Sequence, residues 1–365
     1  MKKVLFCTPY EGVSNSNIGG ISVWAKAIMA YYKEVTSAVE LVVCPLDRKT
    51  YVRGVNAVVR LWSGIVEYIS LVKNVKGRIK SEPFDSIHLC TTASLGLIKD
   101  WLILRYAKAK GMTTLLHFHC GRIPEIINRN NWETYLLKRV LRMTDTALVM
   151  DATSLEALQR WGFRNGVNMP NPLSTFVCQT VGRLQAKVER IPRQLLFVGH
   201  VVDIKGVYEL VEACSAMNVA LRMVGHVEDG VKKHLMDIAA KREGEWLCFT
   251  GGLSREDTLR EMLAADILVV PSYIEGFPNV ILEGMACGTP IVASRVGAIP
   301  EMLAGGECGV LIEPRKEDEI RAAVEMLLND IEKKKRIAQL AQERVERLYS
   351  IASVWNQLEE IWKKG

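Results

Sequence analysis

Short apolar runs alternate with amphipathic stretches along the whole chain, and this alternation is the strongest constraint on its fold. The apolar runs have the length of β-strands, and the stretches between them have helical length and periodicity. Strands that alternate with helices form parallel sheets, because each helix carries the chain back to start the next strand in the same direction. The predicted strands are Lys3–Thr8, Val39–Pro45, Ser86–Thr91, Thr113–His119, Thr146–Met150, Gln194–Val198, Ala220–Val224, Trp246–Thr250, Asp266–Val270, Pro290–Ala293 and Gly309–Ile312.

The predicted strands fall into two groups, separated by the segment Met169-Pro-Asn-Pro172, whose prolines are typical of a linker. A length of 365 residues also fits two domains. We therefore predict an α/β protein with two Rossmann-like, doubly wound domains, residues 1–170 and 171–348, facing each other across a cleft. Because open parallel sheets bind ligands at the carboxyl ends of their strands, we expect the site in that cleft.

Basic residues are concentrated in the first half of the chain. Residues 1–170 contain 23 Lys and Arg against 13 Asp and Glu, a net charge of +10, whereas residues 171–365 carry −4. The total of +6 is too small for a dedicated nucleic-acid-binding protein, so we expect no nucleic acid partner. The uneven distribution indicates an anionic partner for the first half, with a merely solvated surface as the alternative.

The nine cysteines are scattered, mostly in apolar runs, without a CxxC pair or a zinc-like cluster. We interpret them as buried thiols in a reducing cytoplasm. The apolar run after Lys3 is too short for a signal peptide. The stretch Val55–Val75 contains Arg60, Glu67 and Lys73, so it cannot comfortably span a bilayer, although it could lie on one.

The segment from Pro271 to Pro290 combines a turn, a helix start and two carboxylates directly after a predicted strand. Its Gly-Phe-Pro-Asn turn opens a helix, whose free N–H groups and partial positive charge suit a phosphate. Glu275 precedes the turn and can accept hydrogen bonds from sugar hydroxyls, and Glu283 can accept them from a ribose diol. A helix cap with a surface glutamate is the alternative interpretation.

This segment resembles the donor-site signature of the retaining, nucleotide-sugar-dependent glycosyltransferases of family 4. The resemblance is carried by Glu275 and Glu283, by the Gly-Met-Ala-Cys-Gly-Thr-Pro that follows them, and by Gly297-Ala-Ile-Pro-Glu301. It implies the GT-B fold, with the acceptor on the first domain and the nucleoside-diphosphate sugar on the second. It also implies that a C-terminal helix, at about residues 349–365, packs back on the first domain.

Other positions agree with the resemblance. Lys205, after the predicted strand Gln194–Val198, would contact the donor diphosphate and stabilise the leaving group without a metal ion. The family usually has an arginine where this chain has His200, which puts the usual pair of cations in doubt. Gly19 and Gly20 match the family's glycine loop near the diphosphate, although a plain turn is also consistent with them.

A histidine near the end of the fourth predicted strand matches a position that lines the family's sugar pocket, and we assign it to His119. His117 and His119 could also be a structural pair, but no carboxylate or cysteine completes a metal site at recognisable spacing, so we expect no metal. The segment Cys248–Leu253 resembles the strand end that meets the nucleobase. The expected catalytic residues are His119, Lys205 and Glu275, and the expected donor-binding residues are Gly19, Gly20, Gly199, His200, Lys205, Gly251, Leu253, Glu275, Gly276, Phe277, Pro278, Asn279, Val280 and Glu283.

The predicted helix Trp132–Met143 is basic and amphipathic. With other basic residues of the first domain it could form a surface for anionic lipid headgroups or for a lipid-diphosphate acceptor. Packing of its apolar side into the domain, with charges that are merely solvated, is the alternative. We expect a cytoplasmic protein, peripheral on the inner face of the membrane. The basic residues concerned are Arg53, Arg60, Lys73, Lys76, Arg78, Lys80, Lys138, Arg139 and Arg142.

The resemblance implies transfer of a sugar from a nucleoside-diphosphate sugar to an acceptor hydroxyl, with retention at the anomeric carbon and without a cofactor or bound metal. We expect a UDP-sugar as donor, a glycan or lipid-linked acceptor, and a role in surface polysaccharide or glycolipid assembly. One alternative is a sugar-nucleotide epimerase of similar fold, which would convert the donor without an acceptor. Another is a non-catalytic, membrane-docked scaffold, which would not convert it at all.

Overall fold

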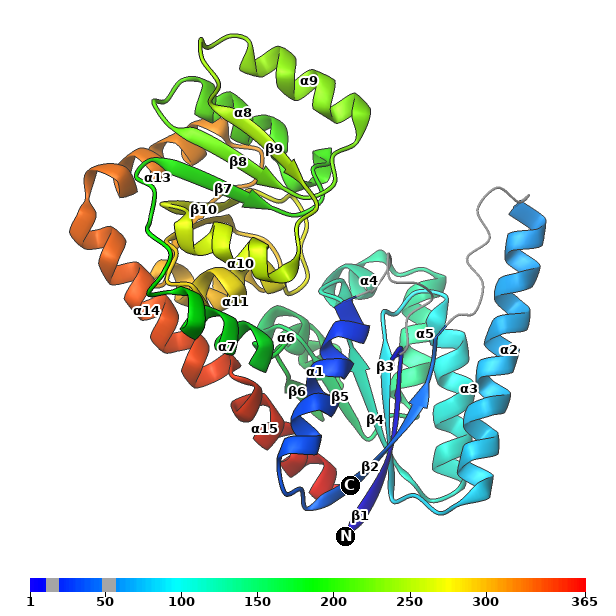
Figure 1. Ribbon diagram of the computed structural model, residues 1–365. Coiled ribbons are helices and arrows are strands. Elements are labelled where there is room, and N and C mark those ends of the chain that lie inside the picture. The colour runs from blue at the N-terminus through cyan, green and yellow to red at the C-terminus, as the bar shows by residue number, and fades with distance from the viewer. Residues whose placement is uncertain (11–19, 48–56) are drawn as a thin grey trace. The chain divides into compact units, whose positions relative to one another are not determined.

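The computed structural model describes residues 1–10, 20–47 and 57–365, with side chains from residue 64 onward in the last range. The chain divides into two compact units, Met1–Pro172 with Ile351–Gly365, and Leu173–Ser350. Each unit contains a six-stranded parallel sheet with helices on both faces (Figure 1). The prediction of two doubly wound α/β domains is confirmed.

The sheet of the first unit has the strand order β2-β1-β3-β4-β5-β6. β1 explains why its strands read as continuous apolar runs. Val4 and Phe6 point into one core and Leu5 and Cys7 into another, because successive residues of a strand face opposite sides of the sheet. The strands are β1 (Lys2–Thr8), β2 (Val39–Pro45), β3 (Ser86–Thr91), β4 (Thr113–Phe118), β5 (Thr146–Val149) and β6 (Gly166–Asn168).

Helices cover both faces of this sheet. One face carries α1 and α15, and the other carries α2 to α6. Within the described ranges, neither the long α2 nor any other helix combines the length and apolar character needed to cross a bilayer. The helices are α1 (Gly20–Glu34), α2 (Ala57–Ser81), α3 (Gly96–Ala109), α4 (Ile123–Arg129), α5 (Trp132–Leu141), α6 (Ala152–Arg160) and α15 (Ile351–Lys364).

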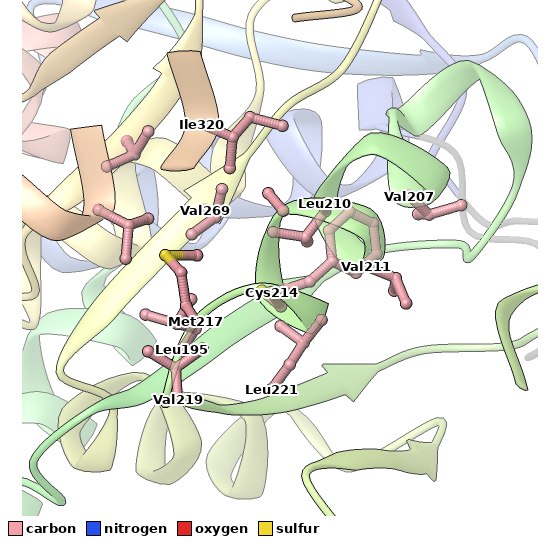
Figure 2. Close-up of a cluster of buried hydrophobic side chains, with 14 of the residues drawn as sticks. Leu195, Val207, Leu210, Val211, Cys214, Met217, Val219, Leu221, Val269 and Ile320 are labelled. Atoms are coloured by element: carbon pink, nitrogen blue, oxygen red, sulfur yellow. The ribbon is translucent and has the colours of Figure 1, made fainter. Parts of the chain in front are cut away.

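The second unit has the strand order β12-β11-β10-β7-β8-β9. Figure 2 shows part of its core, in which α8 packs Leu210 and Cys214 against strand residues such as Leu195 and Leu221. The strands are β7 (Gln194–Val198), β8 (Ala220–Val224), β9 (Leu247–Gly251), β10 (Ile267–Val270), β11 (Ile291–Ser294) and β12 (Val310–Ile312).

The helices of the second unit also form two layers. α8, α9 and α13 contribute to the core in Figure 2, while α7, α10, α11 and α14 pack on one another. Short 3-10 turns η1 (Asp203–Lys205) and η2 (Ala304–Gly306) lie in loops. The helices are α7 (Thr175–Leu184), α8 (Val207–Ser215), α9 (Asp229–Ala239), α10 (Arg255–Ala264), α11 (Asn279–Ala286), α12 (Ile299–Met302), α13 (Glu317–Asn329) and α14 (Ile331–Tyr349).

All nine cysteines are free thiols. Six are buried, as predicted, and Cys120 is half-buried. The interpretation as buried thiols is wrong for Cys178 and Cys248, which are exposed. Cys178 lies on the outer side of α7, and Cys248 lies on β9 at the edge of its sheet, where one side of the strand has no neighbour.

α15 brings the end of the chain onto the first unit. Its Trp362 is fully buried among residues of β1 and α1, including Phe6 and Trp24. Glu359 accepts hydrogen bonds from the hydroxyl of Ser37 and the backbone N–H of Ala38, both at 2.8 Å. The first unit therefore includes both ends of the chain in one core.

Trp362 also sets the protonation of a row of buried histidines. Its indole N–H donates to Nδ1 of His88 at 3.0 Å, so neutral His88 carries its proton on Nε2. That N–H donates to Nδ1 of His117 at 3.2 Å, which leaves the proton of His117 on its own Nε2. Burial lowers the pKa of His88 to about 3 and that of His117 well below its usual value.

Cys90 lies beside this row, and the ligand atoms of His88, Cys90 and His117 lie within 4.8 Å of one another. These residues are not close together in the sequence, so no sequence motif predicted this group. The facing nitrogens of the two histidines already share a hydrogen bond, and Trp362 holds the other nitrogen of His88. We therefore interpret the group as a hydrogen-bonded part of the core.

Replacing Trp362 with Ala should lower the free energy of unfolding of the first unit by about 3–5 kcal/mol, because it leaves a large cavity and removes the hydrogen-bond partner of Nδ1 of His88. Trp362→Phe should cost less, since it removes the N–H but keeps most of the ring volume. Chemical denaturation followed by circular dichroism measures both. Trp132→Ala is the control, since Trp132 is 52% exposed, and an equal loss in that variant would contradict the assignment.

The buried histidines predict a pH-dependent stability. In the unfolded chain they take up protons below about pH 6.5, whereas in the folded protein the pKa of His88 is about 3. As the pH falls below 6.5, the unfolded state binds more protons, so the free energy of unfolding should drop by up to about 1.4 kcal/mol per pH unit for each such histidine. Denaturation at pH 7.5, 6 and 5 tests this. The slope should survive replacement of the exposed His200 by Gln, and a flat profile would refute the prediction.

Candidate functional site

Two loops meet at the carboxyl ends of β7 and β10, the neighbouring strands at which the order of the second sheet reverses. Open α/β sheets bind their ligands at such a point, because the two crossovers leave in opposite directions. The backbone N–H of Tyr273 donates to the carbonyl of Ile204 at 2.9 Å and joins the loops. Gly206, with φ +67°, permits this approach, since a Cβ atom there would lie 2.1 Å from the carbonyl oxygen of Pro271.

Lys205 and Glu275 form an ion pair between these two loops. The ammonium nitrogen of Lys205 lies 2.6 Å from Oε1 of Glu275. The side chains are only 29% and 12% exposed, so solvent screens the pair less than it would at an open surface. The two predicted catalytic residues of the second unit are therefore in direct contact, with an ammonium group that can bind a phosphate beside a carboxylate that can accept hydrogen bonds from hydroxyls.

The loop after Glu275 leads directly into α11. Gly276 accepts a hydrogen bond from the backbone N–H of Ala298 at 2.9 Å, which anchors the loop to the segment after β11. Phe277 is buried, and its ring lies 5.8 Å from that of Tyr349, so it packs inside the unit. The turn and the first residues of α11 are formed by Pro278, Asn279 and Val280.

Glu283 lies one turn further along α11, beside an arginine that the sequence did not identify. Its Oε1 lies 3.6 Å from Nη2 of Arg255, the first residue of α10. Burial raises the pKa of Glu283, and Arg255 opposes that rise. The guanidinium of Arg255 also lies 5.0 Å from the ring of Phe176. At this position of α11, a carboxylate therefore lies beside a guanidinium group that has further N–H donors.

Glycines end three neighbouring strands, β7, β8 and β9. The absence of side chains at these positions lets the strand ends lie close together. Gly225 has φ +141°, and a Cβ atom there would lie 1.9 Å from the carbonyl oxygen of Gly199. Its N–H donates to the carbonyl of Gly251 at 2.9 Å. Beyond these ends the chain exposes the side chains of His200 and Leu253.

Two predicted site residues belong to the first unit. Gly20 is the exposed first residue of α1, while its predicted partner Gly19 lies outside the described residues. His119 follows β4, with its ring 4.7 Å from Trp24 and 4.0 Å from His117 between ring centroids. Burial lowers its pKa to about 3, and its Nε2 is buried without a hydrogen-bond partner among the described residues. This imidazole is therefore neutral at physiological pH.

Sequence reasoning missed several polar side chains near the strand ends of the second unit. The hydroxyls of Ser272 and Ser294 are buried after β10 and at the end of β11, without a partner in the described part of the chain. Tyr273 donates its hydroxyl proton to Glu209 of α8 at 2.7 Å, and burial raises its pKa. Ser272 and Tyr273 follow soon after a predicted strand, and that position could have indicated them as site residues. Nothing in the sequence singled out Arg255.

Residues 185–344 match the family model described as "Glycosyl transferases group 1". This segment includes both loops of the switch point and both predicted carboxylates. The match therefore covers the part of the chain in which the sequence placed the donor motifs.

Curated relatives match a similar stretch. MMP alpha-(1->4)-mannosyltransferase of Mycolicibacterium hassiacum is 33% identical over 170 residues, which is 45% of this chain and 41% of that protein. D-inositol 3-phosphate glycosyltransferase of Corynebacterium efficiens is 31% identical over 209 residues, 53% of this chain and 44% of that protein. The matches thus span less than half the length of these relatives.

Solved structures of similar fold cover the whole chain. Sucrose-phosphate synthase of Thermosynechococcus elongatus superposes with a TM-score of 0.76 at 18% identity, over 100% of this chain and 99% of that one. The Anabaena protein HepE in complex with UDP-glucose gives a TM-score of 0.73 at 17% identity, over 100% of both chains. The chain therefore has the GT-B fold, and residues 185–344 of its second unit are similar to the glycosyl transferases group 1 model.

Proposed function

We propose that this protein transfers a sugar from a nucleoside-diphosphate sugar to an acceptor hydroxyl, with retention at the anomeric carbon. The observation that carries the proposal is the ion pair of Lys205 and Glu275 at the switch point of a group 1 glycosyltransferase domain. The pair supplies a cation for a phosphate and an acceptor for sugar hydroxyls within one contact.

The proposed chemistry is electrostatic. As the bond between the anomeric carbon and the diphosphate breaks, its electron pair leaves with the nucleoside diphosphate. The acceptor oxygen forms the new bond, and its proton passes to the leaving diphosphate. Lys205 stabilises the charge that builds on the diphosphate, so the reaction needs no bound metal or cofactor. The N-terminus of α11 and the backbone at Gly19 and Gly20 assist it.

The ion pair suggests how the donor enters. In the structure, the carboxylate of Glu275 accepts a hydrogen bond from the ammonium group of Lys205. A donor diphosphate carries more negative charge than one carboxylate and replaces Glu275 on Lys205. The carboxylate of Glu275 is then available to the hydroxyls of the donor sugar. His119, which is neutral and half-buried, lines the sugar pocket in this proposal.

The nucleoside is proposed to bind along α11 and the glycine-rich strand ends. Glu283 accepts hydrogen bonds from the ribose diol, and the backbone from Gly251 to Leu253 contacts the base. We favour a UDP-sugar, since the structural neighbour HepE was solved with UDP and with UDP-glucose. The resemblance in fold leaves the identity of the sugar to experiment.

The acceptor is proposed to bind the basic first unit. A net charge of +10 on residues 1–170 favours an anionic acceptor, such as a lipid-linked diphosphate or a glycan that carries acidic groups. A protein of this kind would act at the inner face of the membrane in surface polysaccharide or glycolipid assembly. An epimerase would convert the donor alone, and a scaffold would convert nothing, so product analysis with and without acceptor separates the three functions.

Replacing Glu275 with Ala should lower turnover of the donor by about 100-fold or more, because the variant loses the group that orients the donor sugar. Nucleotide release in the presence of the acceptor measures it. Glu243→Ala is the matched control, since Glu243 is an exposed carboxylate of the same unit outside the site. Near-full activity of the Glu275 variant would exclude this donor site.

Replacing Glu283 with Ala should weaken binding of the donor by about tenfold, since one hydrogen-bonded contact with the ribose is lost. Titration calorimetry with the nucleoside diphosphate gives the affinity directly. Thermal denaturation of the same variant checks that the second unit remains folded. An affinity equal to that of the wild type would refute the ribose role.

A further inference from the structure

Three neighbouring helices of the first unit, α2, α3 and α5, share one pattern on their outer sides. They lie next to one another on the same face of the sheet (Figure 1). α2, α3 and α5 directly precede β3, β4 and β5 in the chain. Because these three strands are parallel, the three helices point in the same direction.

Among the side chains that the structure describes on the outer side of each helix, apolar residues come first along the chain and basic residues follow. Half of the sixteen large hydrophobic side chains that are exposed among the described residues lie here. In α3 and in α5, the apolar and basic side chains follow one another at intervals of three and four residues. Each of these two helices therefore carries its apolar and basic side chains in a single stripe. The apolar residues are Ile65, Val66 and Ile69, then Leu95, Ile98 and Leu102, then Trp132 and Tyr135, and the basic ones are Lys73 and Lys76, then Arg105, then Arg139 and Arg142.

Arginines from two helices surround a hollow at the basic end of this surface. The hollow has a volume of about 310 Å³ and is lined by Trp101, Arg105, Arg139, Arg142 and Met143. The guanidinium groups of Arg105 and Arg139 lie 5.4 and 4.6 Å from the ring centre of Trp101. Trp101 therefore holds two guanidinium groups at the edge of an open, partly apolar space.

Among the described residues, these three arginines have no acidic partner. Other arginines of the first unit pair with glutamates, as Arg129 does with Glu125. In the part of the chain that the structure describes, no carboxylate lies within ion-pair distance of Arg105, Arg139 or Arg142, and Arg139 donates instead to the hydroxyl of Tyr135 at 3.0 Å. Clustered guanidinium groups with free donors are suited to a phosphate group, which they can hold with two parallel hydrogen bonds.

We propose that the outer side of α2, α3 and α5 docks on a bilayer that contains anionic phospholipid, with a lipid phosphate in the arginine-lined hollow. The exposed aromatic and aliphatic side chains of the apolar stripes enter the headgroup region, where tryptophan and tyrosine are favoured. Nucleic acid would satisfy the arginines but would leave this apolar surface in water. The inference rests on the proposed function in one respect, since that function makes the first unit the acceptor-binding unit. Docking on the bilayer itself requires no turnover.

Co-sedimentation with vesicles tests the proposal. Wild-type protein should bind vesicles of phosphatidylcholine with about 30% phosphatidylglycerol and should not bind phosphatidylcholine alone. The variant Arg105→Gln, Arg139→Gln, Arg142→Gln should bind the anionic vesicles about 100-fold less tightly, since each basic side chain contributes about 1 kcal/mol. The matched control is Lys33→Gln, Arg160→Gln, Arg164→Gln, which removes the same charge from exposed positions of the same unit outside these helices. Equal binding by wild type and the arginine variant would overturn the proposal.

A second variant separates the bilayer from a free phosphate. Ile69→Ser, Leu102→Ser, Tyr135→Ser changes exposed side chains only and should weaken vesicle binding. Unchanged vesicle binding in this variant, or displacement of wild-type protein from vesicles by millimolar glycerol phosphate, would overturn docking on a bilayer. Binding of UDP, followed by thermal shift, should be the same in all variants. Vesicle binding without donor binding would refute the proposed function and leave this inference intact.

Discussion

Burial of each parallel sheet on both faces is the constraint on which the rest of the structure depends. A central strand such as β1 must be apolar along its buried middle, from Val4 to Cys7, because one side chain in two meets each helical layer. Polar groups that act on a ligand are then confined to the loops at the strand ends. Parallel strands place those loops at one edge, which is how Lys205 and Glu275, seventy positions apart in the sequence, form an ion pair.

The first unit meets this constraint with a helix from the far end of the chain. α15 covers part of its sheet with Trp362 and Trp355, and the indole N–H of Trp362 donates to His88, the first member of a buried histidine row. Imidazoles can stay in such a core only if they are neutral and correctly protonated. The same tryptophan thus contributes apolar packing and determines which nitrogen of His88 and His117 carries the proton, next to the predicted site residue His119.

The two units differ in the charge that they offer to their proposed partners. The proposed donor site of the second unit uses few, well-positioned groups, and its arginine beside Glu283 is already paired with that carboxylate. The first unit carries an excess of basic residues, of which Arg105, Arg139 and Arg142 have no acidic partner in the described chain. The proposed donor site therefore depends on geometry, whereas the proposed bilayer surface depends on uncompensated charge beside exposed apolar side chains.

The sequence by itself determined the fold class, most strand positions and the donor motif, because periodicity and local turn chemistry reside in neighbouring residues. It missed β6, since three residues are too few to establish a period. Only the tertiary structure decided which distant residues meet, such as Trp362 with His88, Arg255 with Glu283 and Arg105 with Arg139. Those contacts depend on strand order and on helix neighbours, and both are set by packing of the whole unit and not by any local segment.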